Sequence, residues 1–272
     1  MRPRVLITEP LAQEGIALLE SQAAVETKLG LGHQELVSSI GGYEGLIVRS
    51  ETTVSADVIA AGEKLQVIGR AGVGVSNIDL DAATMRGIVV VNAPTGNTVS
   101  AAEHTLALML AMARHIPQAN TRLKGGEWDR HDFMGIELQG KTLGIVGLGK
   151  VGSEVAKRAQ AMGMRLIAYD PFIPGEHARN LGAEPVSLEE LLQQSDFITV
   201  HTPLTSATKG LVGPAELRLV KPTVRFINTA RGGIVDERAL YQALEEGRVA
   251  GAAVDVFSEE PAQDNILLKS DK

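Results

Sequence analysis

The stretch TLGIVGLGKVG, residues 142–152, leads from an apolar run into glycines at positions 147, 149 and 152. This order predicts a β-strand, a tight turn and the start of a helix, which together form a dinucleotide-binding turn. One glycine makes the bend, one lets a pyrophosphate approach the backbone, and one lets the helix pack on the strand. The helix expected over 151–162 would point its N-terminal amides at the phosphates. The predicted cofactor contacts here are Gly147, Gly149, Lys150, Val151 and Gly152.

Asp170 ends the next predicted strand, 18 residues after Gly152. A carboxylate at this position accepts both ribose hydroxyls of NAD and repels the 2′-phosphate of NADP. The eight residues that follow Asp170 contain no Arg or Lys that could bind such a phosphate. The sequence therefore predicts NAD as the cofactor.

Composition limits the class of protein. The chain has 272 residues, enough for two compact units, and its 44% hydrophobic and 22% charged residues are typical of globular proteins. A formal net charge of −7 provides no basic face for nucleic acid, and the absence of cysteine excludes disulfides, thiol nucleophiles and Cys-ligated metals. We expect no metal site. Met1 leads directly into a strand-like segment and the longest apolar stretch, 106–113, is too short to span a membrane, so we expect a cytoplasmic protein.

Short β-branched runs alternate with helical patterns in two series, which predicts an α/β protein with two doubly wound parallel sheets. The first series of expected strands is 4–8, 24–28, 45–49, 66–69 and 88–92, and the second is 142–146, 165–169, 197–201, 225–228 and 251–256. Between them, the Pro/Gly/Asn-rich segment 92–97 predicts a hinge, so we expect domains over 1–94 and 95–272. The helix expected over 98–115 is apolar on nearly all sides, so it is either a core helix or a subunit interface of a homodimer or higher oligomer.

Five motifs in order carry a resemblance to a known family: GRAGVGV at 69–75, GLGKVG at 147–152, HTPL at 201–204, NTARGG at 228–233 and DVFSEEP at 255–261. Along its whole length the chain resembles the D-isomer-specific 2-hydroxyacid dehydrogenases, most of all their D-3-phosphoglycerate dehydrogenase branch. The resemblance implies a flavodoxin-like substrate domain and a Rossmann NAD-binding domain, with the active site in the cleft between them. It also implies that Thr202, Pro203, Thr229, Ala230 and Asp255 line the nicotinamide part of the cofactor site.

Arg231 is the first candidate catalytic residue. It follows the predicted strand 225–228 at its carboxyl end, the edge where open α/β sheets bind ligands. Its planar guanidinium suits the carboxylate and carbonyl of a 2-oxo acid and can polarise the C=O. The resemblance assigns the same role to this position.

Glu260 is the second candidate, and its role comes from the resemblance alone. In the family, the glutamate before this proline pairs with a catalytic histidine and raises the histidine pKa. Taken alone, the residues do not choose between Glu260 and its neighbour Glu259, and both fit a solvated turn.

The histidine of the family should lie in a His-Xaa-Gly segment after Glu260, and the sequence reaches Lys272 without one. The C-terminal helix that returns to the substrate domain in the family is also absent, so we expect a truncated chain. None of the six histidines matches the catalytic position. We expect His104 to pack in the core or an interface, His201 to lie beside the nicotinamide residues, and the others to be solvated: His33, His115, His131 and His177.

On the substrate side, Arg49 and Arg70 end predicted strands at a cleft edge, and by the resemblance such arginines bind the phosphate of phosphoglycerate. The amides of Gly72, Val73 and Gly74 could form an anion-binding nest, although without the resemblance an ordinary strand-to-helix turn is the preferred interpretation. Asn97 resembles a substrate-domain contact, and Arg130 is a weaker candidate.

The expected activity is NAD-dependent oxidation of 3-phospho-D-glycerate to 3-phosphohydroxypyruvate, the first step of L-serine biosynthesis. One alternative is a glyoxylate or hydroxypyruvate reductase or another D-2-hydroxyacid dehydrogenase. An alternative of another class is an NAD-sensing interaction protein, like the corepressors that share this fold. The expected partner is a phosphorylated 2-hydroxy acid rather than nucleic acid or a membrane.

Overall fold

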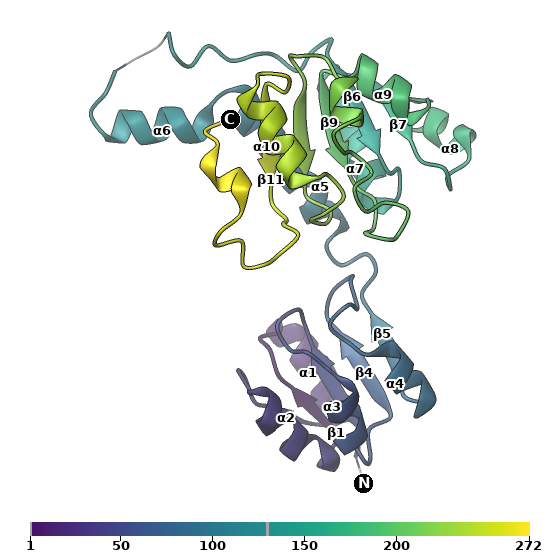
Figure 1. Cartoon of the computed structure of the whole chain (residues 1–272). Helices are drawn as coiled ribbons and strands as arrows, with labels where there is room; N and C mark the ends of the chain where they lie inside the picture. The colour runs from purple at the N-terminus through teal and green to yellow at the C-terminus, as the bar shows by residue number, and fades with distance from the viewer. Residues whose placement is uncertain (1, 129–130) are drawn as a thin grey trace. The chain divides into compact units, whose positions relative to one another are not determined.

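A computed structural model describes residues 2–128 and 131–272. The chain divides into two compact units, Met1–Asn97 and Thr98–Lys272 (Figure 1). Each unit is built on one parallel sheet. The predicted α/β class with two doubly wound sheets is confirmed.

The first unit has a five-stranded parallel sheet in the order β2-β1-β3-β4-β5, the flavodoxin-like order. Each strand lies within one residue of its predicted bounds. The strands are β1 (Arg4–Ile7), β2 (Ala24–Thr27), β3 (Gly45–Val48), β4 (Val67–Arg70) and β5 (Val89–Asn92).

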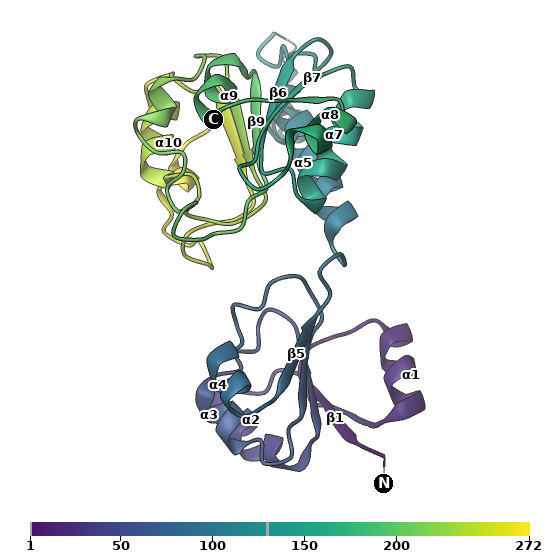
Figure 2. The ribbon, with the colours of Figure 1, turned by 90° about the vertical axis from the view of Figure 1, so that its right-hand side faces the viewer.

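Helices lie on both faces of this sheet (Figure 2). One face carries α2 (His33–Ser39), α3 (Ala56–Ala61) and α4 (Leu80–Met85), and the short turn η1 (Ile40–Gly42) follows α2. These helices enclose the core of the unit, which includes Leu6, Leu36, Leu46, Ile59 and Ile68. The other face carries α1 (Gln13–Gln22), of which no residue is buried.

The second unit has a six-stranded parallel sheet in the order β11-β10-β9-β6-β7-β8, the order of a Rossmann fold. The sequence predicts five of the strands and misses β8, which has three residues and ends on proline. The strands are β6 (Thr142–Val146), β7 (Arg165–Tyr169), β8 (Ala183–Pro185), β9 (Phe197–Val200), β10 (Arg225–Asn228) and β11 (Gly251–Val254).

Two helical layers cover the six-stranded sheet (Figure 2). Helices α5 (Thr98–Ala113) and α7 (Lys150–Ala161) pack over Leu143 and Ile145. Helices α9 (Leu188–Gln194) and α10 (Glu237–Glu245) pack on the opposite face, over Val146 and Ile198. The remaining elements of this unit are α6 (Ile116–Lys124), α8 (Gly175–Asn180), η2 (Glu216–Arg218) and η3 (Ile266–Lys269).

Helix α5 is two-sided in the second unit. One side, with Ala102, Thr105, Leu106, Met109 and Ala113, is buried, which confirms the core interpretation for that side. The other side exposes apolar side chains at two points, Val99 (50%) and Leu110 (37%). The helix ends before the predicted boundary, because His115 takes a left-handed conformation (φ 52°) and precedes α6.

Across the two described ranges, no helix is long and apolar enough to cross a membrane.

Candidate cofactor and substrate sites

The glycine-rich turn lies at the topological switch point of the six-stranded sheet. The turn follows β6, and the segment His201-Thr202 follows the adjacent strand β9. The strands β7 and β8 are added on one side of β6, whereas β9, β10 and β11 are added on its other side, so the strand order reverses here. Gly147 has a φ of 94°, and a Cβ at this residue would lie 2.8 Å from Thr202 Cγ2. The bend and the close approach both require glycine here. Ligands of open α/β sheets bind in the crevice at this point.

Gly149 and Gly152 differ in what surrounds them. Gly149 is the N-cap of α7, and a Cβ there would have no heavy atom within 4 Å. A Cβ at Gly152 would overlap the carbonyl oxygen of Gly147. The second glycine therefore leaves open space above the helix N-terminus, and the third lets the helix pack on the turn.

Asp170 directly follows β7 and reaches across to the turn. Its Oδ2 accepts the backbone N–H of Leu148 at 2.8 Å, and its Oδ1 accepts the N–H of Phe172 at 2.9 Å. Each carboxylate oxygen has two lone pairs, so both keep acceptor capacity for the hydroxyls of a ribose.

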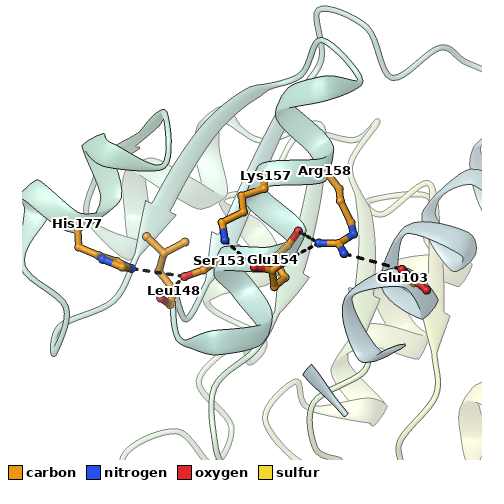
Figure 3. Close-up of polar contacts among 7 residues, drawn as sticks. All are labelled: Glu103, Leu148, Ser153, Glu154, Lys157, Arg158 and His177. Atoms are coloured by element: carbon orange, nitrogen blue, oxygen red, sulfur yellow. Dashed lines mark hydrogen bonds and ion pairs between the residues drawn. The ribbon is translucent and has the colours of Figure 1, made fainter. Parts of the chain in front are cut away.

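The start of α7 is fastened to its neighbours by side-chain contacts (Figure 3). Ser153 Oγ donates to the carbonyl of Leu148 at 3.1 Å and lies 3.4 Å from His177 Nε2 of α8. Farther along the helix, Arg158 forms ion pairs with Glu154 and, at 3.8 Å, with Glu103 of α5. These contacts join α7 to the turn at Leu148 and to α5 at Glu103.

His201 and Thr202 directly follow β9 and lie next to Gly147 of the glycine-rich turn. The Thr202 hydroxyl is buried, and its oxygen has no hydrogen-bond partner among the residues described. Such a group is rare in native proteins, and water, an ion or a ligand can supply its partner. Burial lowers the pKa of His201 to about 4, so its ring is neutral at physiological pH, and it lies 2.8 Å from Thr199 Oγ1. Two features therefore fit a bound dinucleotide: the Thr202 hydroxyl without a partner among the described residues and the free space at Gly149, at the N-terminus of α7.

The residues expected around the nicotinamide lie at the carboxyl ends of β10 and β11, which are neighbours in the sheet. Thr229 Oγ1 lies 2.8 Å from Thr105 Oγ1 of α5, and the Ala230 N–H donates to Asn228 Oδ1 at 3.1 Å. Asp255 Oδ1 lies 3.3 Å from His104 Nε2, an ion pair when the imidazole is protonated. The expectation of a core position for His104 is wrong, since its side chain is 47% exposed. It lies on the edge of the helix, where an acidic partner can reach it.

Arg231 and Glu260 lie on adjacent loops. A Cβ at Gly232 would overlap the backbone of Phe257, so the turn that carries Arg231 touches the loop that carries Glu260. Arg231 is exposed and Nη1 donates to the carbonyl of Ala230 at 2.7 Å. Glu260 Oε1 accepts the N–H of Phe257 at 3.0 Å.

Glu259 is placed differently from Glu260. It lines a cavity of about 860 Å³ between α10 and the segment 258–266, to which Lys209, Arg238 and Tyr241 also contribute. The two adjacent glutamates thus have different surroundings, a distinction that the sequence alone could not make.

Glu237, the first residue of α10, anchors the loop after β11, and the sequence analysis missed it. Its carboxylate accepts the Ser258 N–H (2.6 Å), the Ser258 hydroxyl (2.8 Å) and the Asn265 amide (2.7 Å). The signal for such an anchor is weak, because a glutamate in the first turn of a helix is ordinary on dipole grounds alone.

In the first unit, Arg49 follows β3 at the switch point between β1 and β3. Its backbone N–H donates to Oε1 of Glu9, the second residue after β1, at 2.7 Å, and its guanidinium is exposed beside the carbonyl of Pro10 (3.4 Å). Glu9 is only 5% exposed and also accepts the N–H groups of Glu51 and Thr52. Burial acts to raise the pKa of Glu9, but the hydrogen bonds from Thr52, Arg49 and Glu51 outweigh it, so the pKa is lowered. Sequence reasoning missed this buried carboxylate.

Arg70 ends β4, next to β3, so both candidate arginines lie on the carboxyl edge of one sheet. Its side chain lies against Gly72, and its Nε is buried with no partner among the described residues. In the predicted nest, the Gly72 N–H donates to the Arg70 carbonyl at 2.8 Å, and the Val73 carbonyl accepts from Asn92 at 2.6 Å. Gly74 is half-buried in the same turn.

Asn97 is the last residue of the first unit, and Arg130 lies outside the described residues. Lys150 and Val151 open α7, and Pro203 is exposed after Thr202. The exposed His33 forms an ion pair with Asp57 at 2.6 Å. Within the described ranges, no group of three or more His, Asp or Glu side chains is arranged to hold a metal ion.

Comparison with known families identifies the second unit as a known kind of domain. Residues 106–272 match the model of the D-isomer specific 2-hydroxyacid dehydrogenase NAD binding domain. The chain belongs to this family. An NAD-binding domain therefore contains the glycine-rich turn, Asp170 and Thr202, whose buried hydroxyl has no hydrogen-bond partner among the described residues.

The relatives extend the match over nearly the whole chain. The chain is 53% identical over 98% of its length to D-3-phosphoglycerate dehydrogenase of Methanocaldococcus jannaschii, and equally so to that of Archaeoglobus fulgidus. It spans about half the length (51%) of each of these relatives. The crystal structure of the TT0316 protein from Thermus thermophilus is 39% identical with a TM-score of 0.87, covering 95% of this chain and 83% of that one. A glyoxylate reductase from Paecilomyes thermophila is 31% identical with a TM-score of 0.86, covering 98% and 85%.

Proposed function

We propose that the protein is an NAD-dependent dehydrogenase that oxidises 3-phospho-D-glycerate to 3-phosphohydroxypyruvate, the first step of L-serine biosynthesis. The observation that carries the proposal is the 53% identity, over 98% of the chain, to proteins called D-3-phosphoglycerate dehydrogenase. The glyoxylate reductase matches at 31%. On this proposal, the first unit binds the substrate and the second binds NAD.

The reaction takes a hydride from C2 of the substrate and a proton from its C2 hydroxyl. NAD, when bound, supplies the nicotinamide that accepts the hydride. Arg231 binds the carboxylate and the C2 oxygen with its two-pronged guanidinium and favours the carbonyl that forms. Glu260 stabilises the protonated form of a histidine that takes the hydroxyl proton and that belongs to a longer form of the chain.

Arg49 and Arg70 bind the substrate phosphate in this proposal. Both lie on the carboxyl edge of the first sheet, and Arg70 Nε is buried without a partner in the described part of the chain. Two cations near one dianion allow a protein of net charge −7 to bind phosphoglycerate, because local charge pairs outweigh the distant field. The amides of Val73 and Gly74 and the side chain of Asn97 complete the substrate contacts. The Gly72 N–H is bonded to the Arg70 carbonyl, so Gly72 contributes instead by leaving room for the Arg70 side chain.

Three further features belong to the proposal. Asp170 selects NAD over NADP because a carboxylate repels the 2′-phosphate. The exposed side of α5, with Val99 and Leu110, joins two copies of the chain in a homodimer or a higher oligomer. The protein acts in the cytoplasm.

The test is oxidation of NADH by 3-phosphohydroxypyruvate, measured for the 272-residue chain and for the gene product read to its natural stop. We expect turnover only in the longer form, with glyoxylate and unphosphorylated hydroxypyruvate much poorer substrates. In the longer form, Arg49→Ala should lower kcat/KM for the phosphorylated acid at least about tenfold and leave kcat/KM for the unphosphorylated acids unchanged. The matched control is Arg2→Ala. Arg2 is an exposed arginine that precedes β1, at the amino edge of the sheet, opposite the carboxyl edge where Arg49 lies.

A reductase for glyoxylate or hydroxypyruvate is the second candidate, favoured by the TM-score of 0.86 to the glyoxylate reductase. Equal or better turnover of the unphosphorylated acids would select it. NADH binding without turnover of any of these acids, even in the longer form, would select the NAD-sensing interaction protein.

A further inference from the structure

Two consecutive residues of α5 contact two residues of the predicted nicotinamide site. Thr105 Oγ1 lies 2.8 Å from Thr229 Oγ1, after β10, and His104 Nε2 lies 3.3 Å from Asp255 Oδ1, after β11. The two strand ends are adjacent in the sheet, so one turn of helix braces both.

The hydrogen-bond directions at Thr105 follow from its partners. Thr105 is fully buried, and its hydroxyl donates to the carbonyl of Ala101 at 2.8 Å, since a carbonyl can only accept. A hydroxyl has a single proton, so Thr105 must accept from Thr229. The Thr229 proton is thereby committed to Thr105, and the lone pairs of Thr229 Oγ1 stay available to accept a hydrogen bond.

Asp255 is arranged in a similar way. Oδ1 is paired with His104, while Oδ2 has acceptor capacity left. Glu103, next to His104, lies 3.8 Å from Arg158 of α7, which also pairs with Glu154, whereas His104 contacts Asp255. Thr229 and Asp255 are therefore two acceptors held by α5.

We infer that His104 and Thr105 are positioning residues for the nicotinamide end of the cofactor. A carboxamide has two N–H donors, and acceptors at Thr229 and Asp255 match them in kind. The α5 contacts fix the hydroxyl direction of Thr229 and the rotamer of Asp255, so neither needs to reorganise when the cofactor binds. This inference rests on the proposed NAD site and adds two residues to it that lie outside the family motifs quoted above.

The test compares two ligands on the 272-residue chain, NADH and ADP-ribose, the latter lacking the nicotinamide. Thr105→Val keeps the shape of the side chain and removes the hydroxyl, while Thr105→Ser keeps the hydroxyl. His104→Ala removes the imidazole that lies against Asp255, while His104→Gln keeps a polar side chain with an N–H group there. Binding is measured by titration calorimetry for each variant with each ligand, and folding is checked by thermal unfolding.

We expect Thr105→Val to raise the Kd for NADH about three- to tenfold, the effect of one hydrogen bond. His104→Ala should raise it about two- to fivefold, the effect of one half-exposed ion pair. The Kd for ADP-ribose should change by less than about twofold, and Thr105→Ser and His104→Gln should restore NADH binding. An equal rise for both ligands would show a merely structural role and overturn the inference, as would an unchanged Kd for NADH. Failure of the unmodified chain to bind either ligand would overturn the cofactor site itself. NADH binding to the longer form without turnover would leave this inference standing and reject only the proposed reaction.

Discussion

The carboxylate of Asp170 accepts the backbone N–H of Leu148 at 2.8 Å, so the acidic end of β7 is bonded directly to the turn after β6. Two segments that are 22 residues apart in the sequence are joined at one point. The group predicted to select the ribose is thus held in place before any ligand binds, which lowers the cost of ordering it on binding.

Replacing Asp170 with alanine should weaken NADH binding and reduce the discrimination against NADPH. The change removes a charged acceptor for the ribose hydroxyls, worth about 1.5–3 kcal/mol, and we therefore expect the Kd for NADH to rise about 10- to 150-fold. The loss for NADPH should be smaller because the repulsion of its phosphate disappears as well. Titration of both nucleotides measures the ratio, with Glu176→Ala on the nearby α8 as a control for net charge. An unchanged NADH-to-NADPH ratio would contradict the assignment.

Gly149 and Gly152 should respond to the same substitution in different ways. Gly152→Ala forces a Cβ into the Gly147 carbonyl, so we expect a loss of stability of about 1–3 kcal/mol from overpacking. Gly149→Ala adds a methyl group in open space at a φ of −69°, so stability should be kept while the pyrophosphate is blocked and NADH binding falls. Urea unfolding and NADH titration separate the two effects. A stable Gly149→Ala variant with unchanged NADH affinity would place the pyrophosphate elsewhere.

Glu9 should stabilise the first unit only when it is ionised. Its folded pKa lies below its ordinary value, so its contribution is present above about pH 4.5 and is lost as the pH falls through the folded pKa. Glu9→Gln leaves backbone donors of Arg49, Glu51 and Thr52 with a poorer acceptor, and we expect a loss of about 2–4 kcal/mol at pH 7.

Urea unfolding of Glu9→Gln and of the unmodified chain at pH 7 and near pH 4 tests this contribution. The difference in unfolding free energy between them should shrink at the lower pH. The exposed Glu20→Gln should change stability little at either pH. A difference that is the same at both pH values would show that the charge of Glu9 is not the stabilising feature.

The sequence predicted the positions that follow strands better than the contacts among them. Gly147, Asp170 and Arg231 could be assigned because a buried strand is an unbroken apolar run and its carboxyl end is where ligands bind. The contact of Thr105 with Thr229 spans 124 residues and that of Glu9 with Arg49 spans 40. Nothing local marks such pairs, since they depend on how strands order themselves in the sheet.

Short elements and elements that are apolar on most sides were also difficult to predict from the sequence. Strand β8 has three residues, too few for a periodic signal, and it escaped prediction. Helix α5 has apolar residues on most sides, so its sequence could not show which side packs on β10 and β11 and which is exposed. The observed orientation of α5 places His104 beside Asp255 rather than in the core.

Glu237 should control the order of the loop that carries Glu260, because its carboxylate accepts three hydrogen bonds from Ser258 and Asn265. Glu237→Gln replaces one acceptor oxygen by a donor, so the loop should open more often. We expect backbone amides of 257–260 to exchange with deuterium about tenfold faster, which corresponds to the loss of roughly one net hydrogen bond. Glu245→Gln, at the other end of α10, is the matched control and should leave this exchange unchanged, because Glu245 bonds Ser270 instead. Hydrogen exchange followed by mass spectrometry resolves the segment. Equal exchange in both variants would mean that the loop is held by the contact of Phe257 with Gly232 and not by the carboxylate of Glu237.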